Sequence, residues 1–242
     1  MPVDEDLGER FWNGTKDRRD KDDGSLDWDS RPETYKEYPG MERLQLPPPG
    51  PMAMPLGEAM ARRQSVRTYS SEMLTKQEIS DLVYCVSGIN RRERGRELRN
   101  VPSAGALYPI ETYICVNRAE AMAPSIYHYH VRSHSLDLVT PGPAGAKLAS
   151  AALDQRMLEE CSVAFIWTAV FGRQTWKYGQ RAYRYASLDA GHMGQNLALA
   201  CAALGLGCCH VAAFYDDEVN ALLSVDGVEE SAIYLSAVGR MR

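Results

Sequence analysis

The chain has 242 residues, of which 45% are hydrophobic, and a net charge of −5 at pH 7. This length fits one large domain or two small ones, and the apolar content is ample for a core. The acidic balance and the lack of a basic stripe among aromatic residues exclude the usual signature of nucleic-acid binding.

The cysteines and the first residues indicate the compartment. The six cysteines form no Cys-x-x-Cys pair and lie mostly in apolar runs, which is typical of reduced, buried thiols. The first ten residues are acidic and contain no apolar run, so no signal peptide is predicted. We therefore expect a cytoplasmic protein without a membrane anchor.

Residues 1–54 are charge-dense and then proline-rich, with no strong periodicity. Such a segment is either disordered or an arm that packs on a neighbour. Its aromatic residues favour the arm, because solvated tails seldom carry so many (Trp12, Trp28, Tyr35 and Tyr38). We therefore predict an N-terminal arm over 1–54 and one domain over 55–242.

The next elements are predicted from local signals. A short helix is expected over 55–65, and Thr75 to Glu78 is a capping box that starts a helix ending at Gly88. Residues 91–99 are expected to form a charged loop. A tight turn of small residues over 102–109 then leads into a strand over 111–116.

The middle and end of the chain alternate strands and short helices. The pattern predicts a hairpin over 126–139 that turns near 132–135, a helix over 144–153 and a buried strand over 162–170. Asp216 is expected to cap a helix that ends at Leu223, before a last strand over 231–238. With no repeated βαβ unit, this order predicts an α+β fold.

The histidines of the predicted hairpin raise the question of a metal site. His128 and His130 share one face of a strand, and His134 follows nearby. No Cys, Asp or Glu completes a ligand set close to them in the sequence. We predict no metal site.

The stretch from Leu188 to Phe214 is expected to organise the fold, because no Asp, Glu, Lys or Arg occurs between Asp189 and Asp216. Small residues recur three or four apart along it, which places them on one line of a helix (Gly191, Gly194, Ala198, Cys201 and Gly205). Gly205 and Gly207 should end this helix, and the chain should stay buried through Phe214. Its polar residues argue against a membrane span (Gln195, Asn196 and His210). The alternative to a functional role is a simple core helix.

Two sets of residues could carry chemistry. In an extended segment Arg63, Ser65 and Arg67 point the same way, and two guanidinium groups beside a hydroxyl suit a phosphate. The alternative is a solvated basic face. Lys177 and Tyr178 could form an acid–base pair if burial or nearby cations such as Arg181 and Arg184 depress the lysine pKa. The alternative is that both residues belong to the polar surface of a helix start.

These motifs resemble a known family. The segments Arg63-Gln64-Ser65-Val66-Arg67 and Pro102-Ser103-Ala104-Gly105-Ala106-Leu107-Tyr108-Pro109 are similar to those of the FMN-dependent nitroreductase family. The second segment, the Lys177–Tyr185 run, Asp189-Ala190-Gly191-His192 and Ala203-Leu204-Gly205-Leu206-Gly207 resemble the SagB/ThcOx-type dehydrogenase branch. The similarity extends from about Asp27 to Arg242.

The resemblance implies a nitroreductase-like α+β fold with a central antiparallel or mixed sheet flanked by helices. It also implies an entwined homodimer with a long buried central helix and FMN at the subunit interface. The residues that match the FMN-binding segments of the family are Arg63, Ser65, Arg67, Ser103, Ala104, Gly105, Leu107, Val211, Ala212, Ala213 and Arg240.

The resemblance further implies that Lys177 and Tyr178 are catalytic. In azoline dehydrogenases a proton and a hydride leave a thiazoline or oxazoline ring of a modified peptide, and the hydride goes to flavin N5. Lys177 would be the base, and Arg67 would stabilise the reduced flavin. The alternatives are a nitro or quinone reductase that uses NAD(P)H and a flavin-binding scaffold without turnover; NAD(P)H or O2 would complete the flavin cycle.

Overall fold

A computed structural model describes residues 6–19 and 25–242 of the chain, so parts of the expected arm, residues 1–5 and 20–24, lie outside the described residues. The fold is built on a seven-stranded sheet in which every neighbouring pair is antiparallel. Its strands, in spatial order, are β1 (Arg43–Gln45), β6 (Ser135–Pro141), β5 (Ser125–His130), β4 (Ile110–Val116), β7 (Val163–Val170), β9 (Glu230–Arg240) and β8 (Leu206–Val211).

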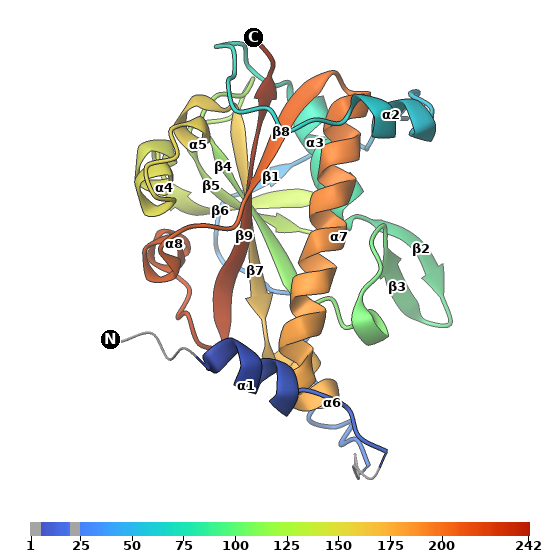
Figure 1. The fold of residues 1–242 in the computed structure, drawn as a ribbon. Coiled ribbons are helices and arrows are strands. Elements are labelled where there is room, and N and C mark those ends of the chain that lie inside the picture. The colour runs from blue at the N-terminus through green and yellow to red at the C-terminus, as the bar shows by residue number, and fades with distance from the viewer. Residues whose placement is uncertain (1–5, 20–24) are drawn as a thin grey trace.

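Helices cover both faces of this sheet (Figure 1). One face carries α3 (Lys76–Ser87) and α7 (Ala182–Ala203), and α2 (Leu56–Arg62) lies beside the upper end of α7. The other face carries α4 (Gly145–Ala151), α5 (Met157–Glu160) and α8 (Asp216–Leu223). The remaining helices are α1 (Leu7–Gly14), α6 (Gly172–Tyr178) and the short 3₁₀ turns η1 (Ala104–Ala106) and η2 (Gly179–Arg181).

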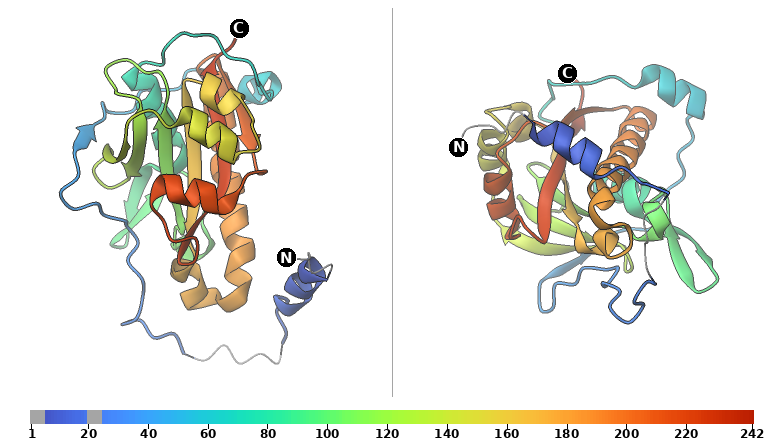
Figure 2. Two further views of the ribbon diagram at one scale, coloured as in Figure 1. Left: turned by 90° about the vertical axis from the view of Figure 1, so that its left-hand side faces the viewer. Right: turned by 60° about the horizontal axis from the view of Figure 1, so that its bottom comes forward.

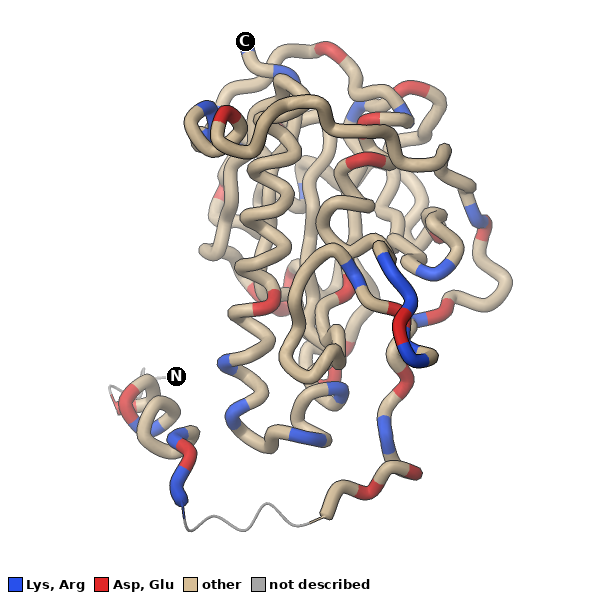
Figure 3. Tube along the Cα trace, turned by 90° about the vertical axis from the view of Figure 1, so that its right-hand side faces the viewer, with Lys and Arg blue, Asp and Glu red and all other residues tan. Residues whose placement is uncertain are grey.

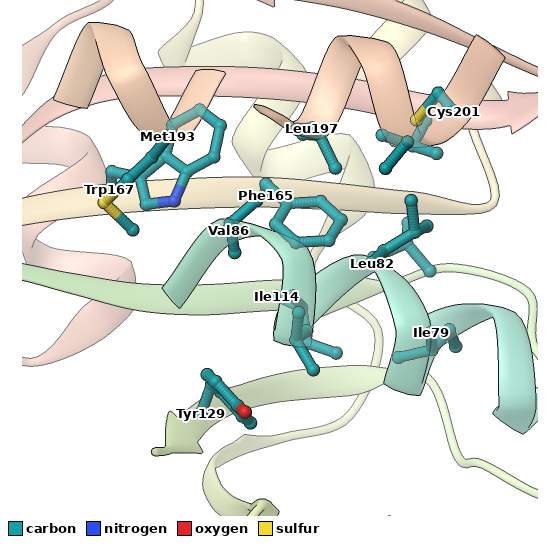
Figure 4. Close-up of a cluster of buried hydrophobic side chains, with 14 of the residues drawn as sticks. Ile79, Leu82, Val86, Ile114, Tyr129, Phe165, Trp167, Met193, Leu197 and Cys201 are labelled. Carbon is teal, nitrogen blue, oxygen red and sulfur yellow. The ribbon is translucent and has the colours of Figure 1, made fainter. Parts of the chain in front are cut away.

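The central strands are buried on both faces, because successive side chains of a strand point to opposite sides. Ile114 and Phe165 pack under α3 and α7 (Figure 4), whereas Tyr113 and Ile166 pack under the helices of the opposite face. All seven residues of β4 are buried. The chain therefore forms three layers with a core on each side of the sheet, and the α+β expectation is confirmed.

Local signals placed several helix ends correctly. Thr75 and Glu78 form the predicted capping box, with the Thr75 side chain accepting from the Glu78 amide and the Glu78 carboxylate accepting from the Thr75 amide. The helix stops at Gly88 as expected. Asp216 was expected to be the N-cap of α8, but it is the first helical residue, where a carboxylate still favours the positive end of the helix.

The central helix α7 ends before Gly205, whose φ of +70° is the left-handed conformation expected after a helix C-terminus. Its turns beyond Asp189 carry no charged residue (Figure 3). At Gly194 the line of small residues leaves room for an aromatic ring, because a Cβ there would lie 2.8 Å from the Tyr234 ring. The close neighbour there is an aromatic side chain of β9, whereas Gly191 faces open space.

The segment over 91–99, expected to be a loop, forms most of a hairpin between β2 (Ile89–Glu93) and β3 (Arg96–Arg99). Its turn residues Arg94 and Gly95 have φ values of +50° and +75°. Two consecutive positive φ angles are characteristic of tight hairpin turns. The prediction failed because nearly continuous charged residues gave no apolar face and arginine is an unusual first turn residue.

Residues 25–55 lie along the outside of the domain formed by the rest of the same chain (Figure 2). The Trp28 and Trp176 rings pack edge to face at 5.3 Å. Lys36 forms an ion pair of 2.5 Å with the carboxylate of Glu230 and donates to the Tyr113 hydroxyl at 2.7 Å. This segment also adds β1 to the sheet.

Candidate active site

The predicted pair Lys177 and Tyr178 ends α6, where it meets the small-residue turn of 102–109. A Cβ added to Gly105 would lie 2.6 Å from the Tyr178 hydroxyl and 3.4 Å from Lys177 Nζ. Residues that are about 70 positions apart in the sequence therefore converge at one place. A side chain at this position would displace the Tyr178 hydroxyl, and its φ of +65° also favours glycine.

The turn itself is held in an unusual backbone conformation. Ala106 and Tyr108 have φ values of +53° and +47°, a left-handed region that costs non-glycine residues free energy. Such conformations persist only where the surroundings impose them, and they gather at functional sites. Two buried contacts impose this one.

The first contact is the carboxylate of Asp189 on α7. It accepts from the Ser103 hydroxyl at 2.6 Å, from the Ala104 amide at 3.3 Å and from Gln174 Nε2 at 2.9 Å. Asp189 is only 5% exposed. Burial raises the pKa of Asp189 above its ordinary value, although these hydrogen bonds oppose the shift. One carboxylate thus ties the turn to both α6 and α7.

The second contact is the guanidinium of Arg173, four residues before Lys177. Its Nη1 donates to Glu111 at 2.5 Å and to the Tyr108 carbonyl at 3.1 Å, and its Nε donates to the Glu33 carbonyl at 2.8 Å. Burial alone would raise the pKa of Glu111, but the charges and hydrogen bonds of Arg173 and His128 outweigh it and lower that pKa. Both ends of the turn are therefore fixed relative to α6.

The nearby cations expected to assist Lys177 have other partners. Arg181 lies 3.1 Å from Asp17 and donates to the Tyr185 hydroxyl at 2.9 Å. Arg184 donates to the Thr15 hydroxyl at 2.6 Å. Both guanidinium groups thus hold the segment around α1 to the end of α6 and the start of α7.

The predicted phosphate-binding residues lie along β8. Ser65 forms a parallel bridge with Cys208, and the Val66 amide donates to the Cys208 carbonyl at 2.9 Å. Burial, followed by the charge of Arg63, lowers the pKa of His210. Arg63 and Arg67 are exposed, and within the described ranges neither has a carboxylate at ion-pair distance. Both guanidinium groups are therefore available to an anion.

Arg240 is differently placed. It pairs with Leu206 in the sheet, and its guanidinium lies 2.8 Å from the Glu78 carboxylate, so it already has a counter-ion. Val211 pairs with Leu235 at the other end of β8, about 17 Å away at 3.4 Å per residue.

The segment after β8 is less buried than expected. Ala212 and Ala213 are exposed, although the chain was predicted to stay buried through Phe214. The strand ends at Val211, and Phe214 beyond it is only partly buried against the core. Leu107, in contrast, is buried beside the turn.

In one chain the predicted site residues form two groups. Lys177, Tyr178 and the turn lie near the lower end of α7, and Arg63 lies near its upper end beside α2 (Figure 1). The 22 residues of α7 span about 33 Å at 1.5 Å per residue. The phosphate-binding group and the catalytic pair are therefore not joined into one complete site along α7.

Sequence reasoning missed the residues that hold the turn, Asp189, Arg173 and Gln174. Asp189 offered one signal, because it is the last charged residue before the uncharged stretch. A single charge at the edge of a buried segment needs a partner, and here the partners are polar groups of the turn.

The three histidines of the hairpin belong to separate hydrogen-bond networks. His128 Nε2 lies 2.8 Å from Glu111, His130 Nε2 lies 2.9 Å from Glu37, and His134 Nε2 lies 2.7 Å from the Ser80 hydroxyl. Over residues 6–19 and 25–242, no group of three or more His, Cys, Asp or Glu side chains could hold a metal ion. In the same ranges, no helix has the length and apolar character needed to cross a bilayer.

Comparison with known proteins places this fold. A protein of Methanocaldococcus jannaschii named as a nitroreductase, MJ1384, is 36% identical over 76% of this chain and 90% of its own length. The trifolitoxin-processing protein TfxB of Rhizobium leguminosarum is 34% identical over 63% of this chain, and the microcin B17-processing protein McbC of Escherichia coli is 30% identical over 58%. The matches span 42% of TfxB and 54% of McbC.

Solved structures agree. A nitroreductase from Anabaena variabilis superimposes with a TM-score of 0.77 at 29% identity, covering 95% of this chain and 45% of that one. The E. coli microcin synthetase McbBCD complex with a bound precursor peptide gives 0.66 at 25% identity, covering 75% of this chain and 70% of that one. These relatives support the resemblance to the SagB/ThcOx-type branch. The sequence model of the Nitroreductase family matches residues 60–240, and the chain belongs to that family of oxidoreductases.

Proposed function

We propose that this protein is an FMN-dependent dehydrogenase of the SagB type that oxidises thiazoline or oxazoline rings of a modified peptide, or a related small substrate. The observation that carries the proposal is the meeting of Lys177 Nζ and the Tyr178 hydroxyl at Gly105. The similarity to two peptide-processing proteins supports it.

The residues along β8 fit a phosphorylated cofactor. Arg63 and Arg67 offer guanidinium groups without carboxylate partners in the described part of the chain, and such forks bind phosphate in two-point fashion. Ser103, Ala104 and Gly105 offer a turn that a flat ring can approach closely. Bound FMN would supply the two-electron acceptor for a hydride.

Lys177 and Tyr178 would handle the proton. Lys177 Nζ lies 5.2 Å from the centre of the Tyr178 ring, and that ring packs edge to face on Tyr185 at 5.0 Å. Lys177 would remove the proton from the ring carbon that becomes aromatic, and the Tyr178 hydroxyl would orient the substrate or relay the proton. Arg67 would stabilise negative charge on the reduced cofactor, as the resemblance implies.

A homodimer would complete this site. The phosphate-binding group and the catalytic pair lie near opposite ends of α7, so a second copy could bring one of each together. Uncharged, exposed side chains of α7 are available for that contact (Leu188 and Gln195). Leu188, the apolar one of the two, is 60% exposed.

The test compares the wild-type protein with Lys177→Ala, Tyr178→Phe and the control Lys147→Ala. Lys147 is exposed on α4, on the opposite face of the sheet. We expect a yellow, dimeric preparation in which Lys177→Ala slows oxidation of a thiazoline peptide by about 10²-fold or more, the range of general acid–base catalysis. Lys147→Ala should match the wild type.

A second candidate function is an NAD(P)H-dependent nitro or quinone reductase, favoured by the extensive match to MJ1384. Anaerobic titration with NADH and NADPH separates the two enzymes. Rapid flavin bleaching together with nitro reduction that survives Lys177→Ala, and no azoline oxidation, would replace the leading proposal. Stoichiometric FMN without either activity would favour a non-catalytic scaffold.

A further inference from the structure

A cavity rich in arginine is lined in part by the small-residue turn of the candidate active site. It has a volume of about 400 Å³ and is enclosed by the β2–β3 hairpin, residues 31–35 of the arm and the small-residue turn. We call it the arginine pocket and define it by Arg31, Arg92, Arg96, Arg132, Tyr35 and Tyr108. Its volume falls within the range usual for small-molecule sites.

The pocket is continuous with the turn that carries the proposed active site. Ala106 and Tyr108 line it, and Ala106 follows Gly105, the residue against which Lys177 and Tyr178 lie. A ligand held in the pocket would therefore extend toward the catalytic pair.

The charges of the pocket are unbalanced. Four guanidinium groups surround a single carboxylate, that of Glu97. Glu97 is already engaged, because it lies 2.9 Å from Arg92 and 3.3 Å from Arg132 and accepts from the Tyr35 hydroxyl at 2.7 Å. These hydrogen bonds, that of Tyr35 foremost, lower the pKa of Glu97 and keep it ionised.

Two of the arginines are left without a carboxylate. In the ranges that the structure describes, Arg31 and Arg96 have no acidic group at ion-pair distance. Arg31 lies on the arm and Arg96 on the hairpin, and both elements line the cavity. The dense charge of the hairpin is visible in Figure 3. A solvated basic surface would leave its charges on a convex face, whereas these line a hollow.

A buried cation lies behind the pocket wall. Arg99 is 5% exposed, and its guanidinium lies 4.6 Å from the centre of the Tyr108 ring and 5.4 Å from that of Tyr35. Its Nε is buried without a hydrogen-bond partner among the described residues. Arg132 lies 4.1 Å from the Tyr35 ring centre. The aromatic wall is therefore backed by positive charge, which strengthens the pull on an anion.

We propose that the arginine pocket binds an oxyanion carried by the substrate and thereby positions the substrate against Lys177 and Tyr178. Arginine forks match carboxylate and phosphate oxygens in paired hydrogen bonds. The oxyanion is either a carboxylate near the reacting ring of a peptide or the additional phosphate of NADPH. This inference rests on the proposed function, and it narrows the substrate to an anionic one.

The first experiment measures binding without turnover. Pyrophosphate is titrated calorimetrically into FMN-saturated wild-type protein, Arg96→Gln, Arg31→Gln and the control Arg94→Gln. Arg94 lies at the tip of the same hairpin but does not line the pocket, so it gives the same change in net charge. Loss of a charge-assisted contact should weaken binding about tenfold or more in the two pocket variants. Arg94→Gln should stay within about twofold of the wild type, the residual effect expected of a screened surface charge.

Two matched pairs identify the source of the oxyanion. Thiazoline peptides with Asp or Asn beside the ring test the carboxylate, and flavin reduction by NADPH against NADH tests the phosphate. We expect one pair to show a lower KM for the anionic member, and Arg96→Gln should remove that preference by raising the KM of the anionic member more than that of the neutral one. Arg96→Lys should restore part of it, because the charge returns without the planar fork.

Several results would overturn the proposal. They are pyrophosphate binding that is absent from the wild type, binding that falls equally in Arg94→Gln, and equal KM values within both matched pairs. Failure of the proposed function looks different. In that case neither the wild type nor any variant oxidises azolines, yet pyrophosphate binding is still weaker in Arg96→Gln than in Arg94→Gln.

Discussion

Removal of the Asp189 carboxylate tests whether this side chain holds the active-site turn. In Asp189→Ala three donors lose their acceptor, and those of Ser103 and Gln174 are short, charge-assisted contacts of 2.6 and 2.9 Å. Bonds to charged groups contribute about 1.5–3 kcal/mol each, and burial of the ionised carboxylate offsets part of the sum. We expect the free energy of unfolding to fall by about 3 kcal/mol in Asp189→Ala and by about 1 kcal/mol in Asp189→Asn.

Urea unfolding followed by tryptophan fluorescence measures these differences, with Glu120→Ala as the control. Glu120 is exposed and should change stability by less than about 0.5 kcal/mol. Asp189→Asn should also lower kcat for azoline oxidation, because a looser turn misplaces Lys177. A loss in Asp189→Ala no larger than that of the control would refute the role assigned to this carboxylate.

The pKa of Asp189 gives a second readout with a defined sign. Its folded-state pKa is raised above the ordinary value of 3.8, so the protonated carboxyl favours the folded state. The free energy of unfolding of the wild type therefore falls as the pH rises through the raised pKa and the carboxyl ionises. Asparagine does not ionise. The stability deficit of Asp189→Asn relative to the wild type should therefore be largest near pH 4 and shrink toward neutral pH; a deficit that grows with pH would contradict the assignment.

Two further predictions follow from buried contacts elsewhere. The pKa of Glu111 is lowered from 4.5, so the stabilisation from its ion pair with Arg173 is complete above pH 4.5 and is lost as the pH falls toward the folded-state pKa. The variant Glu111→Gln should therefore be less stable than the wild type at neutral pH by about 3 kcal/mol. Its stability should also depend less on acid, as measured by urea unfolding at pH 3–7. Gly194→Ala should lower stability by about 1–3 kcal/mol, because its Cβ would lie 2.8 Å from the Tyr234 ring, whereas Gly191→Ala, with open space and a better helix propensity, should gain up to about 1 kcal/mol. Equal thermal shifts in the two glycine variants would show that Tyr234 simply moves aside.

Elements governed by neighbouring residues could be predicted from the sequence. The capping box of Thr75 and Glu78 and the hairpin turn near Ser133 depend on groups within a few positions of one another. The β2–β3 hairpin could not, because runs of consecutive charged residues leave no apolar alternation and its Arg94-Gly95 turn lacks the usual Asn or Asp.

The candidate site shows the same division. The resemblance selected Lys177 and the turn at Gly105 as members of one site, but neither spacing nor periodicity could bring α6 to that turn. The tie between them runs through Asp189, which is 86 positions from Ser103. Contacts at that separation depend on the packing of the whole sheet and its helices, which a local pattern does not contain.

The arm has a consequence for any shortened version of this protein. The family match begins at residue 60, yet the ammonium of Lys36 neutralises Glu230, a carboxylate only 8% exposed that also accepts from the Thr168 and Tyr113 hydroxyls. Deleting everything before residue 55 would leave that acid inside the protein without its counter-charge and would strip the backbone acceptor of Glu33 from Arg173. The boundary drawn by sequence similarity therefore cuts through the electrostatic interior, and a stable fragment must begin upstream of it.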